Sequence, residues 1–242
     1  MQNRGTTESA GRQRGAGALR AAPPMNAAQR VYDDLRERII HFDLPPETTL
    51  SRQDLAAVYE VSQTPVREAI LRLGEEGLVR IYPQSRTIVS KIDIPQLREA
   101  HFLRVSVETE VVRHLALRGG DVAVRDAAAI LAEQRTLAEI PSAMERFTEL
   151  DDAFHESLFR AVNQTGLFHM LKAKTGHLAR LRRLDLPSKG KFAAILEAHA
   201  AIVAAISAGD EAAAAAAMRH HLTGTISSID ALVEANPAYF SP

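Results

Sequence analysis

Apolar residues recur at helical spacing along most of this chain, and one short segment combines that spacing with a polar outer face. Four apolar residues of this segment follow one another at intervals of three and four: Val66, Ala69, Ile70 and Leu73. Such spacing is typical of a helix with one buried side. At about 100° per residue, a second set of side chains lies on another side of the same helix: Gln63, Thr64 and Arg67. The segment is therefore predicted to be a packed helix that presents polar groups to solvent.

A shorter helix is predicted immediately before this one. Ser51 is suited to cap its first turn, with Asp54 three residues later as the reciprocal partner. Three apolar residues give this helix an inner side: Leu55, Ala56 and Val58. Val61 interrupts the pattern, and Ser62 or Thr64 is then expected to cap the following helix. Two short helices joined by a tight turn are thus predicted.

A β-hairpin is predicted after the second helix. Gly77 ends that helix, and residues 78–82 and 87–91 have the β-rich composition of two strands joined by a turn. With a further helix predicted over residues 31–42, the order is three helices and then a hairpin. This order is the layout of a winged helix-turn-helix, whose second paired helix enters the major groove of DNA.

The polar side chains of this unit are suited to bind DNA. A guanidinium, an amide and a hydroxyl near a helix N-terminus can reach base edges and phosphates. The hairpin can lay Arg86 beside a phosphate or in the minor groove. The predicted DNA-binding residues are Arg52, Gln53, Ser62, Gln63, Thr64, Arg67 and Arg86. From the spacing alone, an ordinary surface helix of an all-helical protein remains the alternative.

The run LSRQDLAAVYEVSQTPVREAILRLGEEGLVRIYPQSRTIVSKI resembles the N-terminal domain of GntR-type bacterial transcription regulators. Arg67 matches the DNA-contacting arginine in the family's Ser-Arg-Thr-Pro-Val-Arg-Glu-Ala pattern. Gln63 stands where an arginine is usual, and the wing tip lacks the family's glycine, since its residues are Gln84, Ser85 and Arg86. These departures bear on the operator sequence and not on DNA binding itself.

The rest of the chain has helical periodicity with no convincing strand. Breaks at glycine, proline and asparagine divide it into six predicted helices: 95–118, 122–138, 142–162, 166–185, 190–208 and 210–234. The prediction is therefore a mainly α protein, with a winged helix-turn-helix of three helices plus a β-hairpin and an all-α bundle of six helices. The expected domains are a disordered tail over 1–25, a DNA-binding domain over 26–92 and a helical domain over 93–236, which we expect to bind effector and metal and to dimerise.

Four polar residues interrupt the apolar stripes of three of these helices: Asp151, His155, His199 and His221. A polar group buried without a partner costs about 1–3 kcal/mol, and a bare carboxylate costs far more. One divalent metal bound by a carboxylate oxygen and three imidazole nitrogens would satisfy all four. Core histidines bonded to backbone carbonyls are the alternative, and His101 and His177 lie at stripe edges as further candidates.

This helical region resembles the FCD ligand-binding domain of the FadR-like branch of GntR regulators. In metal-binding members, an aspartate and a histidine four residues apart join two later histidines, and the matching positions are the four residues above. The resemblance implies a divalent metal, with zinc favoured over nickel or manganese. It also implies that Arg104 faces a ligand cavity, where it would hold the carboxylate of a small organic acid. An ion pair between Arg104 and Glu108 is the other interpretation, and the two are compatible.

Composition limits the remaining choices. The chain has 242 residues, no cysteine and no apolar run of the length of about 20 residues that spans a bilayer. The formal charge is −1, with a balance of +2 over residues 1–92 and −3 over the remainder. So small a positive excess means that DNA affinity depends on locally placed arginines and on dimerisation. No membrane partner is predicted, and the expected location is the bacterial cytoplasm, associated with the nucleoid.

The sequence thus predicts a homodimeric transcription regulator that binds a double-stranded operator and is not an enzyme. Its operator affinity would be controlled by a small hydroxy- or sugar acid bound beside the metal, with release from DNA as the expected response. One alternative makes the metal itself the signal. Another is a metal-dependent enzyme with a DNA-binding appendage, because an aspartate and three histidines around a metal could activate water.

Overall fold

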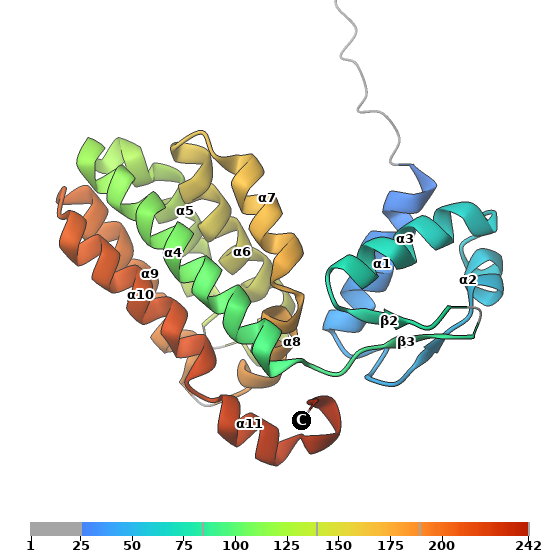
Figure 1. Ribbon diagram of the computed structural model, residues 1–242. Helices are drawn as coiled ribbons and strands as arrows, with labels where there is room; N and C mark the ends of the chain where they lie inside the picture. The colour runs from blue at the N-terminus through green and yellow to red at the C-terminus, as the bar shows by residue number, and fades with distance from the viewer. Residues whose placement is uncertain (1–25, 84, 139, 189, 242) are drawn as a thin grey trace, which may run out of the picture.

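The N-terminal domain consists of three helices and a small sheet (Figure 1). The computed structural model describes residues 26–83, 85–138, 140–188 and 190–241, so the tail predicted over 1–25 lies outside the described residues. The helices of this domain are α1 (Ala27–Ile40), α2 (Arg52–Val58) and α3 (Gln63–Glu75). Its strands are β1 (Thr49–Leu50), β2 (Val79–Ile81) and β3 (Thr87–Val89). The winged helix-turn-helix is therefore present.

The sheet contains one strand more than the predicted hairpin. β3 pairs antiparallel with β2 and also with β1, so the strand order is β1-β3-β2. β1 has only two residues, Thr49 opposite Ile88 and Leu50 opposite Thr87. A strand of two residues is too short to show an alternating pattern, which is why the sequence did not indicate it. It fixes the base of the wing directly before α2.

The core of this domain follows the predicted stripe of α3. Val66, Ala69, Ile70 and Leu73 are all buried, and they pack with Leu35 and Ile39 of α1. The Ser51 hydroxyl accepts a hydrogen bond from the backbone N–H of Asp54 at 3.2 Å, which confirms the predicted cap of α2. The prediction for Val58 is wrong, because this side chain is 69% exposed. Val61, which directly follows the turn, packs against the core in its place.

The C-terminal domain is a helical bundle, as predicted, but it has more helices than the six expected. Its helices are α4 (Ile94–Arg118), α5 (Arg125–Thr136), α6 (Met144–Ala161), α7 (Thr165–Lys174), α8 (Gly176–Asp185), α9 (Lys191–Ser207), α10 (Glu211–Ile226) and α11 (Ile229–Ala235). Short 3-10 turns are η1 (Asp121–Val124), η2 (Pro141–Ala143) and η3 (Pro237–Tyr239). The predicted helices 166–185 and 210–234 are each divided in two.

Both divisions occur where the chain turns toward the N-terminal domain. At the first residue of α8, a Cβ atom on Gly176 would lie 2.8 Å from the Leu78 side chain, so the glycine permits the two domains to approach closely. α11 leaves the line of α10 and packs against α8 beside the linker that leads into α4 (Figure 1). Tertiary packing of this kind is invisible to helical periodicity.

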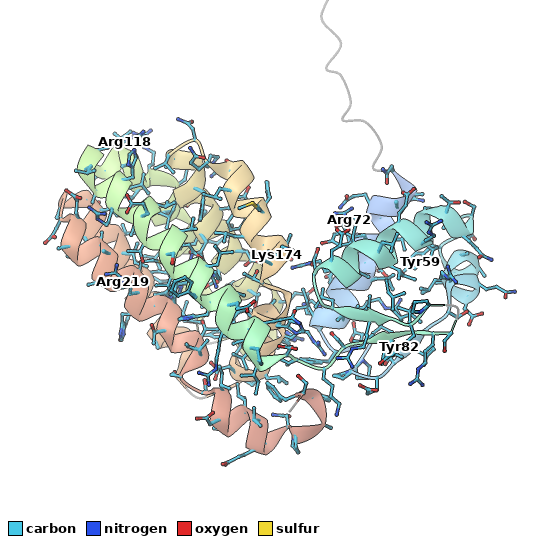
Figure 2. All side chains as sticks on the ribbon, in the orientation of Figure 1. Tyr59, Arg72, Tyr82, Arg118, Lys174 and Arg219 are labelled. Carbon is cyan, nitrogen blue, oxygen red and sulfur yellow. The ribbon has the colours of Figure 1, made fainter. Side chains whose placement is uncertain are left out.

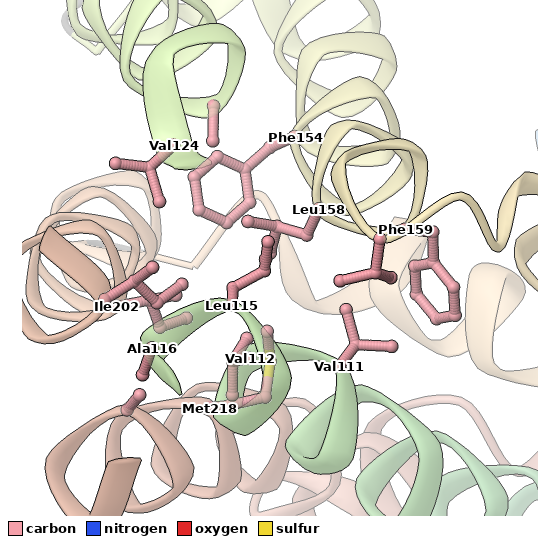
Figure 3. Packing of buried hydrophobic residues seen from close by; sticks show 14 of the residues in the cluster. Val111, Val112, Leu115, Ala116, Val124, Phe154, Leu158, Phe159, Ile202 and Met218 are labelled. Atoms are coloured by element: carbon pink, nitrogen blue, oxygen red, sulfur yellow. The ribbon is translucent and has the colours of Figure 1, made fainter. Parts of the chain in front are cut away.

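The main core of the bundle lies between α4, α6, α9 and α10 (Figure 3). Val112 and Leu115 of α4 meet Phe154 and Leu158 of α6, and Met218 closes the core from α10. All five side chains are at least 99% buried. This packing fixes the spacing of α6, α9 and α10, the three helices that carry the predicted metal ligands.

Direct contacts join the two domains. The Arg180 guanidinium donates to the Ser90 carbonyl at 2.9 Å, and the backbone of Ile92 bonds with that of Tyr239 at 2.7 Å. On the other side, Lys174 at the end of α7 points toward α3, with its Nζ 3.5 Å from the Glu75 carbonyl (Figure 2). None of the helices in the described part of the chain has the length and apolar character required to cross a membrane.

Candidate metal centre and DNA-binding face

The four predicted metal ligands meet at one point inside the bundle. Asp151 and His155 lie one turn apart on α6, while His199 comes from α9 and His221 from α10. One ligand atom from each of the four lies within 4.8 Å of those of the other three. Asp151, His155 and His199 are at most 2% exposed. The i, i+4 spacing on α6 puts its two side chains on one face, as the sequence indicated.

The separations between the ligand atoms suit a single ion. The Nε2 atoms of His155 and His221 are 3.0 Å apart. His155 Nε2 lies 3.9 Å from Asp151 Oδ2, and His199 Nε2 lies 3.5 Å from Asp151 Oδ1. Ligands at about 2.0–2.2 Å in a tetrahedral zinc site are separated by roughly 3.3 Å. The cluster is therefore close to the size that such an ion requires.

Buried side chains fix the orientation of two of the imidazole rings. His155 Nδ1 lies 2.6 Å from Glu108 Oε2, and His199 Nδ1 lies 2.9 Å from Gln134 Oε1. A proton held on each Nδ1 leaves Nε2 with its lone pair directed into the cluster. Phe154 stacks on the His199 ring at 3.8 Å and holds its plane. Both rings thus present the nitrogen that a metal would use.

The protonation of the cluster also suits a cation. Desolvation by burial lowers the pKa of His199 to about 3 and that of His221 well below its usual value. Burial alone would raise the pKa of Asp151, but the Arg182 guanidinium and the neighbouring histidines hold it below its ordinary range. At neutral pH these two imidazoles are neutral and the carboxylate is charged, which are the forms that bind a metal.

Three buried atoms of the cluster residues make no hydrogen bond among the described residues: Asp151 Oδ1, His199 Nε2 and His155 Nδ1, the last of which lies 2.6 Å from Glu108 Oε2. Polar atoms in protein interiors normally have a hydrogen-bond partner or bind an ion. Asp151 Oδ1 and His199 Nε2 lie 3.5 Å apart, so one ligand could bind both of them. A cavity of about 20 Å³ adjoins Asp151 and His221, which is enough for one water-sized group. The residues present therefore fit a divalent ion.

A larger cavity of about 370 Å³ begins at this centre and extends toward α1. Arg104, Glu108, His155 and Arg182 form part of its lining. Arg104 Nε pairs with Glu108 Oε1 at 2.6 Å, so the predicted ion pair is present and uses one nitrogen only. Among the described residues, no partner hydrogen-bonds to the Nη1 or Nη2 group of Arg104. Arg104 therefore lies in the cavity with donors left for an anion.

Sequence reasoning missed two residues of the centre. Arg182 of α8 pairs with Asp151 and lines the same cavity, and Gln134 of α5 is fully buried behind His199. Gln134 follows Ala127 and Leu131 at helical spacing on the buried side of α5, a signal that could have identified it, whereas Arg182 is only partly buried on α8. His101 and His177 do not belong to the four-residue cluster. His177 lies at the domain junction, where its Nδ1 is 3.4 Å from the backbone nitrogen of Asp93.

The seven predicted DNA-binding residues are all exposed. Five of them line one groove of about 520 Å³ between α2, α3 and the wing: Arg52, Gln53, Gln63, Arg67 and Arg86. Ser62 and Thr64 lie at the start of α3, outside that lining. The Arg86 guanidinium lies 5.4 Å from the centre of the Tyr82 ring, which supports its position on the wing. The helices α2 and α3 and the wing thus present guanidinium and amide groups to one groove.

Comparison with known proteins agrees with both halves of this arrangement. The model of "Bacterial regulatory proteins, gntR family" matches residues 27–89, and the FCD domain model matches residues 99–224. The HTH-type transcriptional repressor RspR of Escherichia coli is 30% identical, over 92% of this chain and 96% of its own. The gluconate operon transcriptional repressor of Bacillus subtilis is 29% identical over 76% of each chain. A solved GntR regulator from Rhodococcus covers 88% of this chain and 98% of its own, with 25% identity and a TM-score of 0.63.

These relatives are transcription regulators and not enzymes, so the expectation that this chain is a regulator is confirmed. The buried aspartate and histidines lie within the matched FCD region and are consistent with the metal site of such domains. The chain belongs to the GntR family of DNA-binding transcription regulators, in the FadR-like branch that carries a C-terminal FCD domain.

Proposed function

We propose that a small hydroxy- or sugar acid controls the operator affinity of this regulator by binding beside a divalent metal in the C-terminal domain. The observation that carries the proposal is the convergence of Asp151, His155, His199 and His221 at one point, beside a cavity whose lining includes His155 and Arg104. A metal supplies coordination positions for a carboxylate and an adjacent hydroxyl, and Arg104 supplies hydrogen bonds to the same carboxylate.

Charge supports an anionic effector. Without a metal, the carboxylates of Asp151 and Glu108 balance the guanidinium groups of Arg104 and Arg182 in this part of the cavity. Burial alone would raise the pKa of Glu108, but Arg104 and His155 lower it to about 2, so this acid is charged. A divalent ion would make the inner end net cationic, and a carboxylate would then be the natural counter-ion. The B. subtilis relative is named as a repressor of a gluconate operon, which agrees with a sugar acid.

Zinc is the metal that we propose, with nickel and manganese as alternatives. The donor set of three imidazole nitrogens and one carboxylate oxygen suits zinc, and the separations of 3.0–3.9 Å fit its short bonds. Nickel also binds imidazole, and manganese prefers oxygen donors, so both would accept part of this set. The large cavity beside the centre supports an organic effector over a regulator that responds to metal alone.

A homodimer that works in the bacterial cytoplasm completes the proposal. Two recognition helices must meet half-sites about one helical turn of DNA apart, so a change in the dimer that separates them removes operator affinity. Phe102 and Leu117 of α4, which are 74% and 63% exposed, leave apolar surface for a partner subunit. Sedimentation at micromolar concentration should give twice the monomer mass.

The effector proposal is tested by thermal shift on metal-loaded protein. D-Gluconate and other hydroxy acids should raise the melting temperature, because only the folded state binds them. The shift should be lost after chelation and in Arg104→Ala, since each removes half of the anion site. A melting temperature that responds to zinc but to no organic acid would favour the metal as the signal. A shift that survives both changes would place the effector elsewhere.

A further inference from the structure

The effector cavity has a wall that belongs to the DNA-binding domain. Asp33, Arg36 and Glu37 of α1 line it together with Arg104 and His155 of the C-terminal domain. α1 lies outside the matched FCD region, which begins at residue 99. A ligand that fills the cavity would therefore contact both domains of the chain at once.

The two domains meet at the outer rim of the cavity through acidic side chains. A carboxylate oxygen of Glu37 on α1, a carboxylate oxygen of Glu145 on α6 and a ring nitrogen of His41 lie within 4.8 Å of one another. Neither glutamate has an ion-pair partner among the described residues, and Asp33 lies one turn before Glu37 on α1. At this outer rim the cavity lining includes three carboxylates, those of Asp33, Glu37 and Glu145, and they outnumber the guanidinium group of Arg183.

The inner and outer parts of the cavity thus differ in the groups they would bind. The inner part, with Arg104, Arg182 and the metal centre, suits a carboxylate. The outer part offers carboxylate oxygens, which accept hydrogen bonds and repel a second anion. Hydroxyl groups match the outer part, because each can donate to Asp33, Glu37 or Glu145. One end of the ligand should therefore be acidic and the remainder rich in hydroxyls.

The size of the cavity agrees with an extended ligand. At about 30 Å³ for each water-sized group, a volume of about 370 Å³ holds roughly a dozen non-hydrogen atoms. A three-carbon hydroxy acid fills only about half of this space, whereas a six-carbon sugar acid is about as large as the space itself. The volume also lies within the range of about 300–1,000 Å³ that is usual for ligand sites.

α1 is connected rigidly to the recognition helix. Arg36 Nε pairs with Glu76 Oε2 at 3.0 Å, directly after the C-terminal end of α3, and Tyr32 donates a hydrogen bond to the same carboxylate. The Arg36 guanidinium also donates to the Lys172 carbonyl of α7 at 3.1 Å, across the domain boundary. Arg36 and Glu76 are 14% and 7% exposed, so this pair is shielded from solvent. A displacement of α1 would carry α3 with it.

We propose that the effector is an extended polyhydroxylated monocarboxylate that bridges the two domains, with Asp33 and Glu37 of α1 as the residues that select its hydroxylated end. This inference rests on the proposed function for the carboxylate end of the ligand. The contact with α1 couples occupancy to DNA binding, because a ligand shifts a conformational equilibrium only through contacts that differ between the two states. A short hydroxy acid would fill the inner part and leave α1 where it was.

The test is calorimetric titration of the metal-loaded, full-length protein with three acids. D-Gluconate should bind at least tenfold more tightly than D-glycerate, which lacks the outer hydroxyls. D-Glucarate has the same length but a second carboxylate, and it should bind at least tenfold more weakly than D-gluconate. In the double variant Asp33→Ala/Glu37→Ala, the affinity for D-gluconate should fall at least fivefold, while the affinity for D-glycerate should not change. The difference in affinity between D-gluconate and D-glucarate should become smaller.

A matched control and a second measurement separate the possible failures. Asp34→Ala removes the neighbouring acid of α1, which contacts Arg38 and Tyr59 and does not line the cavity. This variant should leave all three affinities unchanged.

Operator affinity should respond to D-gluconate and not to saturating D-glycerate. If D-glycerate binds as tightly and acts as strongly as D-gluconate, the bridge to α1 is wrong while the proposed function stands. If none of the acids binds, both fail. A second metal ion per subunit that is lost in Glu37→Ala would also overturn the inference, because a cation would then occupy the outer carboxylates.

Discussion

The DNA-binding face and the metal centre use polar side chains in opposite surroundings. The residues predicted to bind DNA are all exposed, so they lie outside the core of the N-terminal domain. Three of the four residues at the metal centre are at most 2% exposed, and they lie between apolar neighbours such as Phe154 and Leu158. An exposed polar residue retains its hydration in the folded state, so it needs no partner within the protein. A buried one also affects the stability of the fold, because it must be paired there.

This difference also determines where a signal can pass between the two sites. α1 lies between the DNA-binding face and the four-residue cluster: it packs against α3 and also lines the cavity beside the cluster. Occupancy of the buried site can therefore reach the exposed one through a single helix.

The largest effect is expected from removing metal ligands. His155→Ala/His199→Ala should abolish binding of the single divalent ion per subunit and remove its contribution to stability, which is about 4 kcal/mol when the free ion stands at a thousand times its dissociation constant. Elemental analysis and thermal unfolding measure both quantities. The matched control is His169→Ala/His220→Ala, which removes two exposed histidines. A wild type that contains no metal and does not respond to added zinc would favour plain core histidines.

A buried histidine outside the metal centre should make the domain junction sensitive to acid. Desolvation and the nearby Arg180 lower the pKa of His177 to about 4, while Asp93 acts in the opposite direction. Because the folded state holds the neutral ring, the unfolded chain binds the extra proton between pH 6.5 and 4, and stability falls as the pH falls. The contribution lost by pH 4 is about 3 kcal/mol.

Denaturant unfolding of chelated wild type and His177→Gln at pH 7 and pH 4 isolates this contribution. The wild type should lose more stability on acidification than the variant, which carries no titrating ring at this position. Equal losses in the two proteins would mean that His177 is hydrated in solution and that the junction is looser than the structure shows.

A smaller effect is expected at the exposed face. Arg67→Ala should weaken operator binding by about 1–3 kcal/mol and leave the melting temperature unchanged, because its side chain contributes to no core. Fluorescence anisotropy with a labelled operator gives the affinity. Arg219→Ala, on the surface of α10 (Figure 2), is the control that removes the same charge far from the DNA-binding domain. Identical affinities for the two variants would remove α3 from the operator contact.

The smallest effect is expected on the wing. If Arg86 contacts a phosphate, Arg86→Ala should weaken binding to every sequence by a similar amount of about 1 kcal/mol. It should also reduce the slope of log affinity against log salt by about 1. Titrations at several salt concentrations measure this slope. A loss confined to one operator sequence would instead indicate that Arg86 inserts into the minor groove.

The two regions also differed in how far the sequence could predict them. The stripe of α3 and the convergence of Asp151, His155, His199 and His221 were both predicted, because the stripe recurs at helical spacing and the four polar residues visibly interrupt such spacing. Arg182 was missed because it reaches Asp151 from a helix that is distant in sequence. The division of the helix at Thr175 and the wall that α1 adds to the cavity depend on how the domains pack. Periodicity within one segment contains no information on such packing.

We propose that one site, made of the metal and Arg104, controls the exposed DNA-binding face. The most direct test is operator binding by fluorescence anisotropy, with and without saturating D-gluconate, for metal-loaded wild type, chelated wild type and metal-loaded Arg104→Ala. We expect D-gluconate to weaken operator binding at least tenfold in the first protein and to have little effect in the other two, because binding and response are linked. An equal response in all three would contradict the account, since the effector would then act without the metal and without Arg104.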